Sequence, residues 1–212
     1  MSQIQYRAIE KRDYEAVCEI INQSFYLYAY IKKEKVLEEF KKNYIYGCLA
    51  EATYTCVAEK DGVIVGIIMG NAKAKYSIVQ HMLPVIKMIY HSWRMKCLGK
   101  KEEGVKTFQH LHEIYHSFNK KHKGMFDGVL TLFAVSKEAR GFGIGKRLWR
   151  RLYDYLKENN VHQIYLYTDS NCNTGFYDKQ GFRRIEEETL NVVREGKTVP
   201  MAIYLYEYKI MV

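Results

Sequence analysis

The sequence lacks the features that mark secreted, linker-rich and membrane-spanning proteins. It has two prolines in 212 residues and no stretch rich in Ser, Gly and Pro. No apolar run approaches the roughly 20 residues that a membrane span requires, and residues 1–13 are polar, unlike a secretory leader. We therefore expect one globular domain over residues 1–212, without stable membrane insertion.

The five cysteines are scattered, odd in number and form no CxxC pair. This pattern argues against a disulfide framework or a structural zinc site and favours a reducing compartment, so we expect a cytoplasmic protein. His112 and His116 share a helical face by their spacing, but no third ligand is in view, and we predict no metal site.

Positive charge is the most general feature that is present, with a formal net charge of +9. This balance favours an anionic partner, and nucleic acid, an acidic membrane surface and a phosphorylated cofactor all qualify. Residues 71–124 mix Lys and Arg with aromatic residues, a pattern that suits a membrane surface or nucleic acid and suits a solvated helix pair equally well. We favour the helix pair and expect no nucleic-acid partner.

Hydrophobic periodicity predicts alternating strands and helices. The first part of the chain is expected to form a strand at 4–9, a helix that begins after Asp13 as its N-cap, and a helix at 36–46. A hairpin of strands at 55–59 and 63–69 is expected, turning through Asp61-Gly62. Helices are then expected at 75–98, with a possible break at Pro84, and at 103–121. The remainder is expected to form a strand at 128–135, a helix at 143–159, a strand at 164–168, a helix at 174–180, and strands at 183–193 and 199–210. The fold class is α/β, with a mixed central sheet flanked by helices and a two-helix insertion, residues 71–124, between the third and fourth strands.

The most informative segment is a glycine-rich turn between the strand ending at Val135 and the next helix, reading Arg140-Gly-Phe-Gly-Ile-Gly145-Lys146. Glycines let the backbone approach an anion, and the unpaired N–H groups of the first helical turn point at it. Arg140 adds a positive charge. The pattern predicts a phosphate site, and a pyrophosphate in particular. The GxGxG spacing departs from the dinucleotide fingerprint, and Arg147 stands where a P-loop needs Ser or Thr.

Together with a downstream segment, this turn resembles the GNAT superfamily of acyl-CoA N-acetyltransferases. The downstream segment reads Asn171-Cys-Asn-Thr-Gly-Phe-Tyr177 and is followed by Gly181-Phe182. Lys137 stands where the family often has proline. The resemblance covers the whole domain in element order, while its specific motifs lie between about 132 and 182.

The resemblance implies an enzyme that moves an acetyl group from acetyl-CoA to a primary amine by direct transfer in a ternary complex. It implies that the loop amides cradle the pyrophosphate. The strand before the loop would pair with the pantetheine arm and aim an N–H at the thioester carbonyl. The cosubstrate-binding residues it implies are Phe133, Ala134, Val135, Arg140, Gly141, Phe142, Gly143, Ile144, Gly145, Lys146, Asn171 and Asn173. For the two asparagines, a helix-capping role stays open.

Tyr177 is the catalytic residue that the resemblance implies, because a phenol can protonate the departing CoA thiolate as a general acid. The general base is unassigned, since the strand 130–135 holds no acidic residue. Asp127, Asp169 and Glu59 stay as candidates.

The acceptor is not identified by the sequence. We expect a small-molecule amine rather than a protein, and we expect the insertion at 71–124 to line the acceptor side. A homodimer through the closing strand 199–210 is left open. The alternative function is an acyl-CoA-binding sensor or regulatory module that keeps the fold without turnover.

Overall fold

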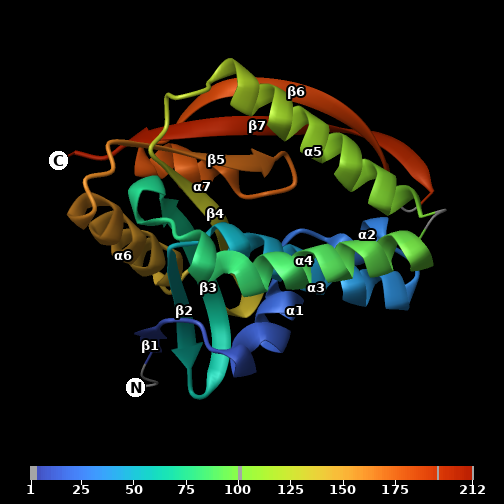
Figure 1. Ribbon diagram of the computed structural model, residues 1–212, viewed down its shortest axis with the longest axis horizontal. Helices are drawn as coiled ribbons and strands as arrows, with labels where there is room; N and C mark the ends of the chain where they lie inside the picture. Colours follow the sequence, from blue (N-terminus) through green and yellow to red (C-terminus); the bar gives the residue numbers. More distant parts are fainter. Residues whose placement is uncertain (1–3, 100–101, 195, 212) are drawn as a thin grey trace.

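The computed structural model describes residues 4–99, 102–194 and 196–211, and it is built on one mixed seven-stranded sheet (Figure 1). The sheet order is β1-β2-β3-β4-β5-β7-β6, and β4 with β5 is the parallel pair among the described strands. The strands are β1 (Ile4–Arg7), β2 (Tyr54–Lys60), β3 (Val63–Ala72), β4 (Gly128–Val135), β5 (Gln163–Asp169), β6 (Arg183–Arg194) and β7 (Lys197–Lys209).

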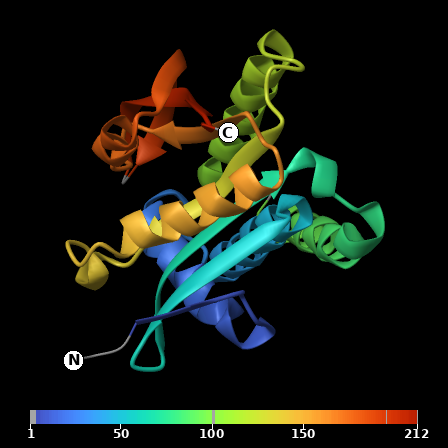
Figure 2. The same ribbon diagram turned by 90° about the vertical axis from the view of Figure 1, so that its left-hand side faces the viewer.

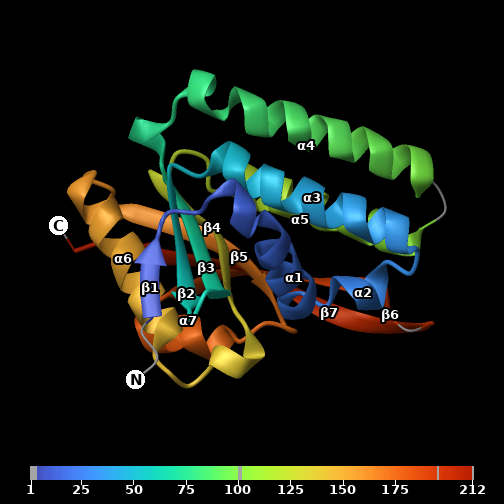
Figure 3. The same cartoon turned by 90° about the horizontal axis from the view of Figure 1, so that it is seen from below.

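Helices cover both faces of this sheet and create two hydrophobic cores. The helices are α1 (Tyr14–Ser24), α2 (Leu27–Tyr30), α3 (Glu34–Glu51), α4 (Ile78–Leu98), α5 (Glu103–Lys121), α6 (Ile144–Glu158) and α7 (Thr174–Gln180). The first core packs α1, α2, α3 and α5 on one face, and the second packs α6 and α7 on the other. In Figure 2, α6 lies across the near face of the sheet. In Figure 3, α4 lies outside α3.

The sequence predictions for the fold are confirmed in type and order. The two expected helices, α4 and α5, lie between β3 and β4, and α4 continues past Pro84 without a break. The short helix α2 was not predicted. No described helix combines the length and the apolar character that crossing a membrane would require.

Asp13 occupies the expected position before α1, but its side chain makes a different set of bonds. Its carboxylate accepts hydrogen bonds from the Arg7 guanidinium at 2.6 and 2.8 Å and from the Glu10 N–H at 2.8 Å, rather than capping the helix. Arg7 also pairs with Glu59 of β2 at 2.6 Å. The guanidinium holds the pKa of Asp13 below its usual range. This network ties β1 to β2 and to the start of α1.

An extra residue in β4 determines the geometry next to the parallel pair. Met69 pairs with Leu132 and Gly70 with Leu130, which leaves Thr131 as a bulge. Leu130 packs in the core under α6, whereas Leu132 packs in the core under α1 and α3. The bulge therefore shifts the alternation of side chains by one residue, and the rest of β4 follows this new phase.

Candidate functional site

The strands β4 and β5 part soon after they meet. Their pairing covers two positions, Gly128 with Ile164 and Val129 with Tyr165. The edge of β4 from Thr131 to Val135 therefore lies beside β5 without a ladder between the described strands, while β3 pairs with its other edge. A strand edge of this kind can pair with an extended ligand. The predicted binding residues Phe133, Ala134 and Val135 all lie on this segment.

The glycine loop follows β4 directly and presents unpaired amides. After a 3₁₀ turn at Lys137–Ala139, Gly141 and Gly143 adopt left-handed φ angles of 87° and 73° and lead into α6. In the part of the chain that the structure describes, the N–H groups of residues 141–146 donate no hydrogen bond to protein atoms. A Cβ atom at Gly141 or Gly143 would meet nothing within 4 Å, so space is open in front of these amides.

Gly145 has a different function, because it lies against the ring of Phe133. A Cβ at Gly145 would lie 3.2 Å from Phe133 Cζ, and the Phe133 ring packs against Phe176 of α7 with centroids 5.0 Å apart. The aromatic pair therefore connects β4, the first turn of α6 and α7. Ile144 anchors the same turn, since its side chain is buried in the core under α6.

Positive charge surrounds the loop. Arg140, Lys146 and Arg147 are exposed, and Arg140 Nε lies 3.4 Å from the Val135 carbonyl oxygen to which it donates. Lys60 Nζ lies 5.3 Å from the centroid of the exposed Phe142 ring. These cations add to the helix dipole of α6, so the start of this helix favours an anion.

Tyr177, the predicted acid, is buried in α7. Its ring packs near Phe133, Phe182 and Tyr206, with centroids 5.5 to 6.4 Å apart. Burial raises the pKa of its hydroxyl, and the nearby Cys172 and Asp169 raise the pKa further. The hydroxyl therefore keeps its proton at neutral pH, as a general acid requires.

The three candidate bases differ in how their carboxylates are used. Glu59 is engaged by Arg7. Asp127 accepts the backbone N–H groups of His162 and Gln163, both at 2.8 Å. Burial alone would raise the pKa of Asp127, but these hydrogen bonds lower it below its usual value, so this side chain stays ionised and fixes the start of β5.

Asp169 ends β5 on the side where β4 has parted from it. Its Oδ1 accepts the Asn171 N–H at 2.7 Å, and its Oδ2 lies 3.7 Å from Cys172 Sγ. Burial raises the pKa of Asp169 above the usual carboxyl value, and the hydrogen bonds offset part of this shift. No described Lys or Arg forms an ion pair with it. A desolvated carboxylate without a cation is suited to bind one or to take a proton.

The charge of this carboxylate acts on four tyrosines, of which Tyr30 and Tyr177 are buried and Tyr44 and Tyr115 are partly buried. Burial raises the pKa values of Tyr30, Tyr44, Tyr115 and Tyr177, and the charge of Asp169 raises each of them further. These tyrosines belong to α2, α3, α5 and α7, and Tyr30 is linked to Asp169 through Asn171, which donates to both side chains. Sequence reasoning missed Tyr30, Tyr44 and Tyr115, since nothing in their spacing separates them from the other tyrosines.

The two predicted asparagines lie at the start of α7 and are exposed. Asn171 Nδ2 donates to the Tyr30 hydroxyl at 3.2 Å, and Asn171 Oδ1 accepts from Arg194 at 3.5 Å. Asn173 occupies the N-cap position of α7, but its side chain makes no capping hydrogen bond. The side chain of Asn173 therefore does not cap α7, and the side chain of Asn171 links the loop to Tyr30 of α2.

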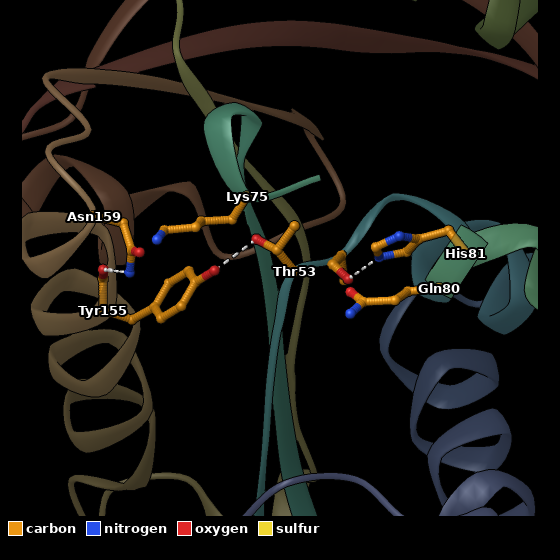
Figure 4. A pocket seen from close by; sticks show the side chains of 7 residues that line it. Thr53, Lys75, Gln80, His81, Tyr155 and Asn159 are labelled. Carbon is orange, nitrogen blue, oxygen red and sulfur yellow. Dashed lines mark hydrogen bonds between the residues drawn. The ribbon is translucent and has the colours of Figure 1, made fainter. Parts of the chain in front are cut away.

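A separate pocket of about 310 Å³ lies at the other end of α6 (Figure 4). Tyr155 donates a hydrogen bond to Thr53 Oγ1 at 2.9 Å, and His81 Nε2 lies 2.9 Å from the Ala52 carbonyl oxygen. Tyr155 is twelve residues beyond Gly143 on the same helix, a separation of roughly 18 Å along the helix axis. This pocket is therefore distinct from the glycine loop, and it contains none of the predicted site residues.

Comparison with known families identifies the relatives of this arrangement. The family model described as "Acetyltransferase (GNAT) family" matches residues 14–182, which is most of the chain. The chain belongs to this family. The match covers the fold from α1 to the end of the loop after α7, including the glycine loop and Tyr177. A comparison with curated proteins gives no match.

Solved structures of family members share the fold at low identity. Arylalkylamine N-acetyltransferase 2 from Aedes aegypti is 14% identical with a TM-score of 0.63, over 99% of this chain and 100% of that one. The putative acetyltransferase yncA from Salmonella typhimurium, solved with its cofactor acetyl-CoA, is 14% identical with a TM-score of 0.56, over 100% and 96%. Ribosomal-protein-alanine N-acetyltransferase from Brucella melitensis is 15% identical with a TM-score of 0.55, over 97% and 99%. These likenesses establish the fold.

Proposed function

We propose that this protein is an N-acetyltransferase that moves an acetyl group from acetyl-CoA to a primary amine by direct transfer in a ternary complex. The observation that carries the proposal is the set of unpaired amides at residues 141–146 beside the free edge of β4. An anion-binding helix start that adjoins an unpaired strand edge suits a ligand with a pyrophosphate and an extended amide-containing arm. The Salmonella relative, solved with acetyl-CoA, supports this choice of cosubstrate.

The residues of the loop and strand fit acetyl-CoA in distinct ways. The left-handed Gly141 and Gly143 leave their amides open to a pyrophosphate, and Arg140 and Lys146 supply charge. The edge of β4 at 133–135 would pair with the pantetheine arm. When bound, acetyl-CoA supplies the activated acetyl group, and the protein supplies its position relative to the amine.

Tyr177 is proposed to act as the general acid. Its raised pKa means that the phenol is protonated at neutral pH and has a proton available when the thiolate departs. Its contact with Phe133 places the ring beside the strand that would hold the thioester arm.

Asp169 is proposed to bind the acceptor amine and to take its proton. An ammonium group enters a buried site at lower free energy when a carboxylate is present to pair with it. The raised pKa of Asp169 brings its basicity closer to neutral pH, which makes it a better proton acceptor than an exposed carboxylate. The charge of Asp169 also raises the pKa of Tyr177, so the proposed base and acid are electrostatically coupled.

The tyrosines whose pKa values the charge of Asp169 raises favour a small amine as the acceptor. Aromatic rings beside a carboxylate attract an ammonium ion through their π faces as well as through the charge. Tyr115 belongs to α5, so the insertion contributes to this side of the site, as we propose for residues 71–124. The Aedes relative is named for arylalkylamine substrates, whereas the Brucella relative is named for a ribosomal protein.

The alternative is a sensor that binds acyl-CoA without turnover. Calorimetric titration of acetyl-CoA into the wild type and the Gly143→Glu variant tests the shared binding step. The wild type is expected to bind at micromolar affinity, and the variant to lose binding because its carboxylate faces the pyrophosphate. Gly124→Glu is the matched control, since Gly124 has a similar left-handed φ of 83° in open space.

The enzyme and the sensor then separate in a second measurement. For the enzyme, CoA release followed with a thiol reagent requires acetyl-CoA and an amine together, across a panel of small amines and peptides. Binding of acetyl-CoA without amine-dependent CoA release would favour the sensor. No binding to the wild type would contradict both functions.

A further inference from the structure

The outer side of α4 is apolar and exposed. Its inner side packs on α3 and buries His81 and Met95. Its outer side carries the α4 face, which we define as Val79, Met82, Ile86, Ile89, Tyr90 and Trp93. Val79 is 79% exposed and Trp93 is 61% exposed. The apolar surface therefore lies on the side of the helix that faces away from the protein.

This face is a continuous stripe rather than a scatter of single residues. Its members recur every three or four positions, so they follow one side of a helix about 31 Å long. More than half of the large apolar side chains that are exposed in the described chain belong to α4. Single exposed apolar residues are common in proteins, but a contiguous stripe marks an interaction surface.

The charge around the α4 face is positive. The sequence contains no Asp or Glu between Asp61 and Glu102. At 100° per residue, Lys96 lies at one margin of the stripe, while Lys87 and Arg94 lie at the other. Lys96 is exposed. Arg94 pairs with Glu39 of α3, and Lys87 Nζ lies 3.2 Å from the Tyr46 hydroxyl, so these two are held at their margin.

We propose that the α4 face docks on an anionic lipid surface, with the helix lying in the plane of the headgroups. A helix with aromatic and aliphatic residues on one side and cations at its margins binds such surfaces through apolar burial and charge attraction together. Figure 3 shows α4 as the outermost element on its side of the molecule, beyond α3. A protruding helix of this kind meets a flat surface along its whole length.

The same features argue against a second copy of this chain as the occupant. A symmetric contact between two α4 faces would bring Lys and Arg margins of equal sign together, which is unfavourable. An anionic surface instead complements every charged margin of the stripe. The proposal does not depend on acetyl transfer, and it does not require a membrane-spanning helix.

The two tryptophans allow a direct optical test, because Trp93 is exposed and Trp149 is buried in the core under α6. The full chain is mixed with vesicles of phosphatidylcholine alone or with 30% phosphatidylserine. We expect cosedimentation and a blue shift of tryptophan emission with the anionic vesicles, both weakened in 0.5 M NaCl. The Trp93→Phe variant should cosediment without the shift.

A pair of charge variants tests the surface itself. Ile86→Asp should lower the vesicle partition coefficient roughly tenfold or more, because it places a carboxylate in the stripe. Val63→Asp is the matched control and should bind like the wild type, since Val63 is 61% exposed, compared with 55% for Ile86, and lies at the start of β3. Absent or equal binding to both vesicle types would overturn the proposal. So would a dimer seen by analytical ultracentrifugation and abolished by Ile86→Asp without vesicle binding.

Discussion

Asp169, at the end of β5, lies close enough to Tyr177 of α7 for its negative charge to raise the pKa of the Tyr177 hydroxyl. The two side chains come from opposite ends of the Asn-containing loop that joins these elements. Their opposite tasks follow from their chemistry, because the phenol keeps its proton and the carboxylate can accept one. Because of this interaction, a substitution that removes the charge of Asp169 should lower the pKa of the Tyr177 hydroxyl.

Replacement of Tyr177 by Phe tests the proposed acid. We expect kcat to fall by about 10²- to 10⁴-fold, because general acid catalysis contributes on this scale. The Kd for acetyl-CoA should change little, since the ring and its packing against Phe133 remain. Tyr153→Phe, which removes a hydroxyl on the surface of α6, is the control and should keep wild-type turnover. Unchanged kcat in Tyr177→Phe would remove Tyr177 from the reaction.

Replacement of Asp169 by Asn tests the proposed base. The amide can still accept the Asn171 N–H, but it cannot take a proton or pair with an ammonium ion. We expect kcat/KM for the amine to fall by about 10²- to 10⁴-fold. The rising limb of the pH profile should change shape, while acetyl-CoA affinity measured by calorimetry is preserved. An unaltered pH profile with full activity would assign the base elsewhere.

The same variant should be more stable than the wild type at neutral pH. Burial raises the pKa of Asp169 in the folded state. The protonated carboxyl therefore contributes to stability at pH values below about 3.8, its pKa in the unfolded chain. This contribution is lost as the pH rises through the higher pKa of the folded state. The gain in Tm for Asp169→Asn should grow from acid towards pH 7, reaching a few degrees. The exposed Glu188→Gln should show no such trend, and a lower Tm for Asp169→Asn at pH 7 would contradict this account.

Two helical glycines offer a matched test of packing. In α5, a Cβ at Gly104 would lie 2.5 Å from the Tyr30 carbonyl oxygen, whereas in α3 a Cβ at Gly47 would lie 3.7 Å from Met88 Sδ. Alanine favours helices by up to about 1 kcal/mol over glycine. We expect Gly47→Ala to gain stability and Gly104→Ala to lose about 1–3 kcal/mol through overpacking. Urea unfolding measures both, and a gain for Gly104→Ala would mean that α5 can move away from α2.

Much of this architecture is predictable from the sequence because its signals are local. The hairpin through Asp61-Gly62 depends on turn chemistry, and the strand at 128–135 depends on a short run of apolar residues after Gly128. The glycine spacing before α6 likewise fixes a left-handed loop with open amides. These features need no knowledge of distant parts of the chain.

The features that sequence reasoning missed arise from contacts across the fold. Gly128 and Ile164, after which β4 and β5 part, lie 36 residues apart, and Tyr30, Tyr44 and Tyr115 lie more than 50 residues from Asp169, whose charge raises their pKa values. Asp13 shows the same limit on a smaller scale. Its position before α1 predicts a cap, but its carboxylate accepts hydrogen bonds from the guanidinium of Arg7 and none from the helix amides.

The bulge at Thr131 sets which face the end of β4 presents to each core. If Thr131 were paired in a regular ladder instead, Phe133 and Val135 would point towards α1 and α3, and Leu132 and Ala134 would point towards α6. Phe133 would then leave Gly145, and the strand would reach the glycine loop facing the wrong core. The connection between β3 and β4 accommodates two whole helices in this chain, whereas one further residue inserted between Leu132 and Val135 should turn the end of β4 towards the wrong core.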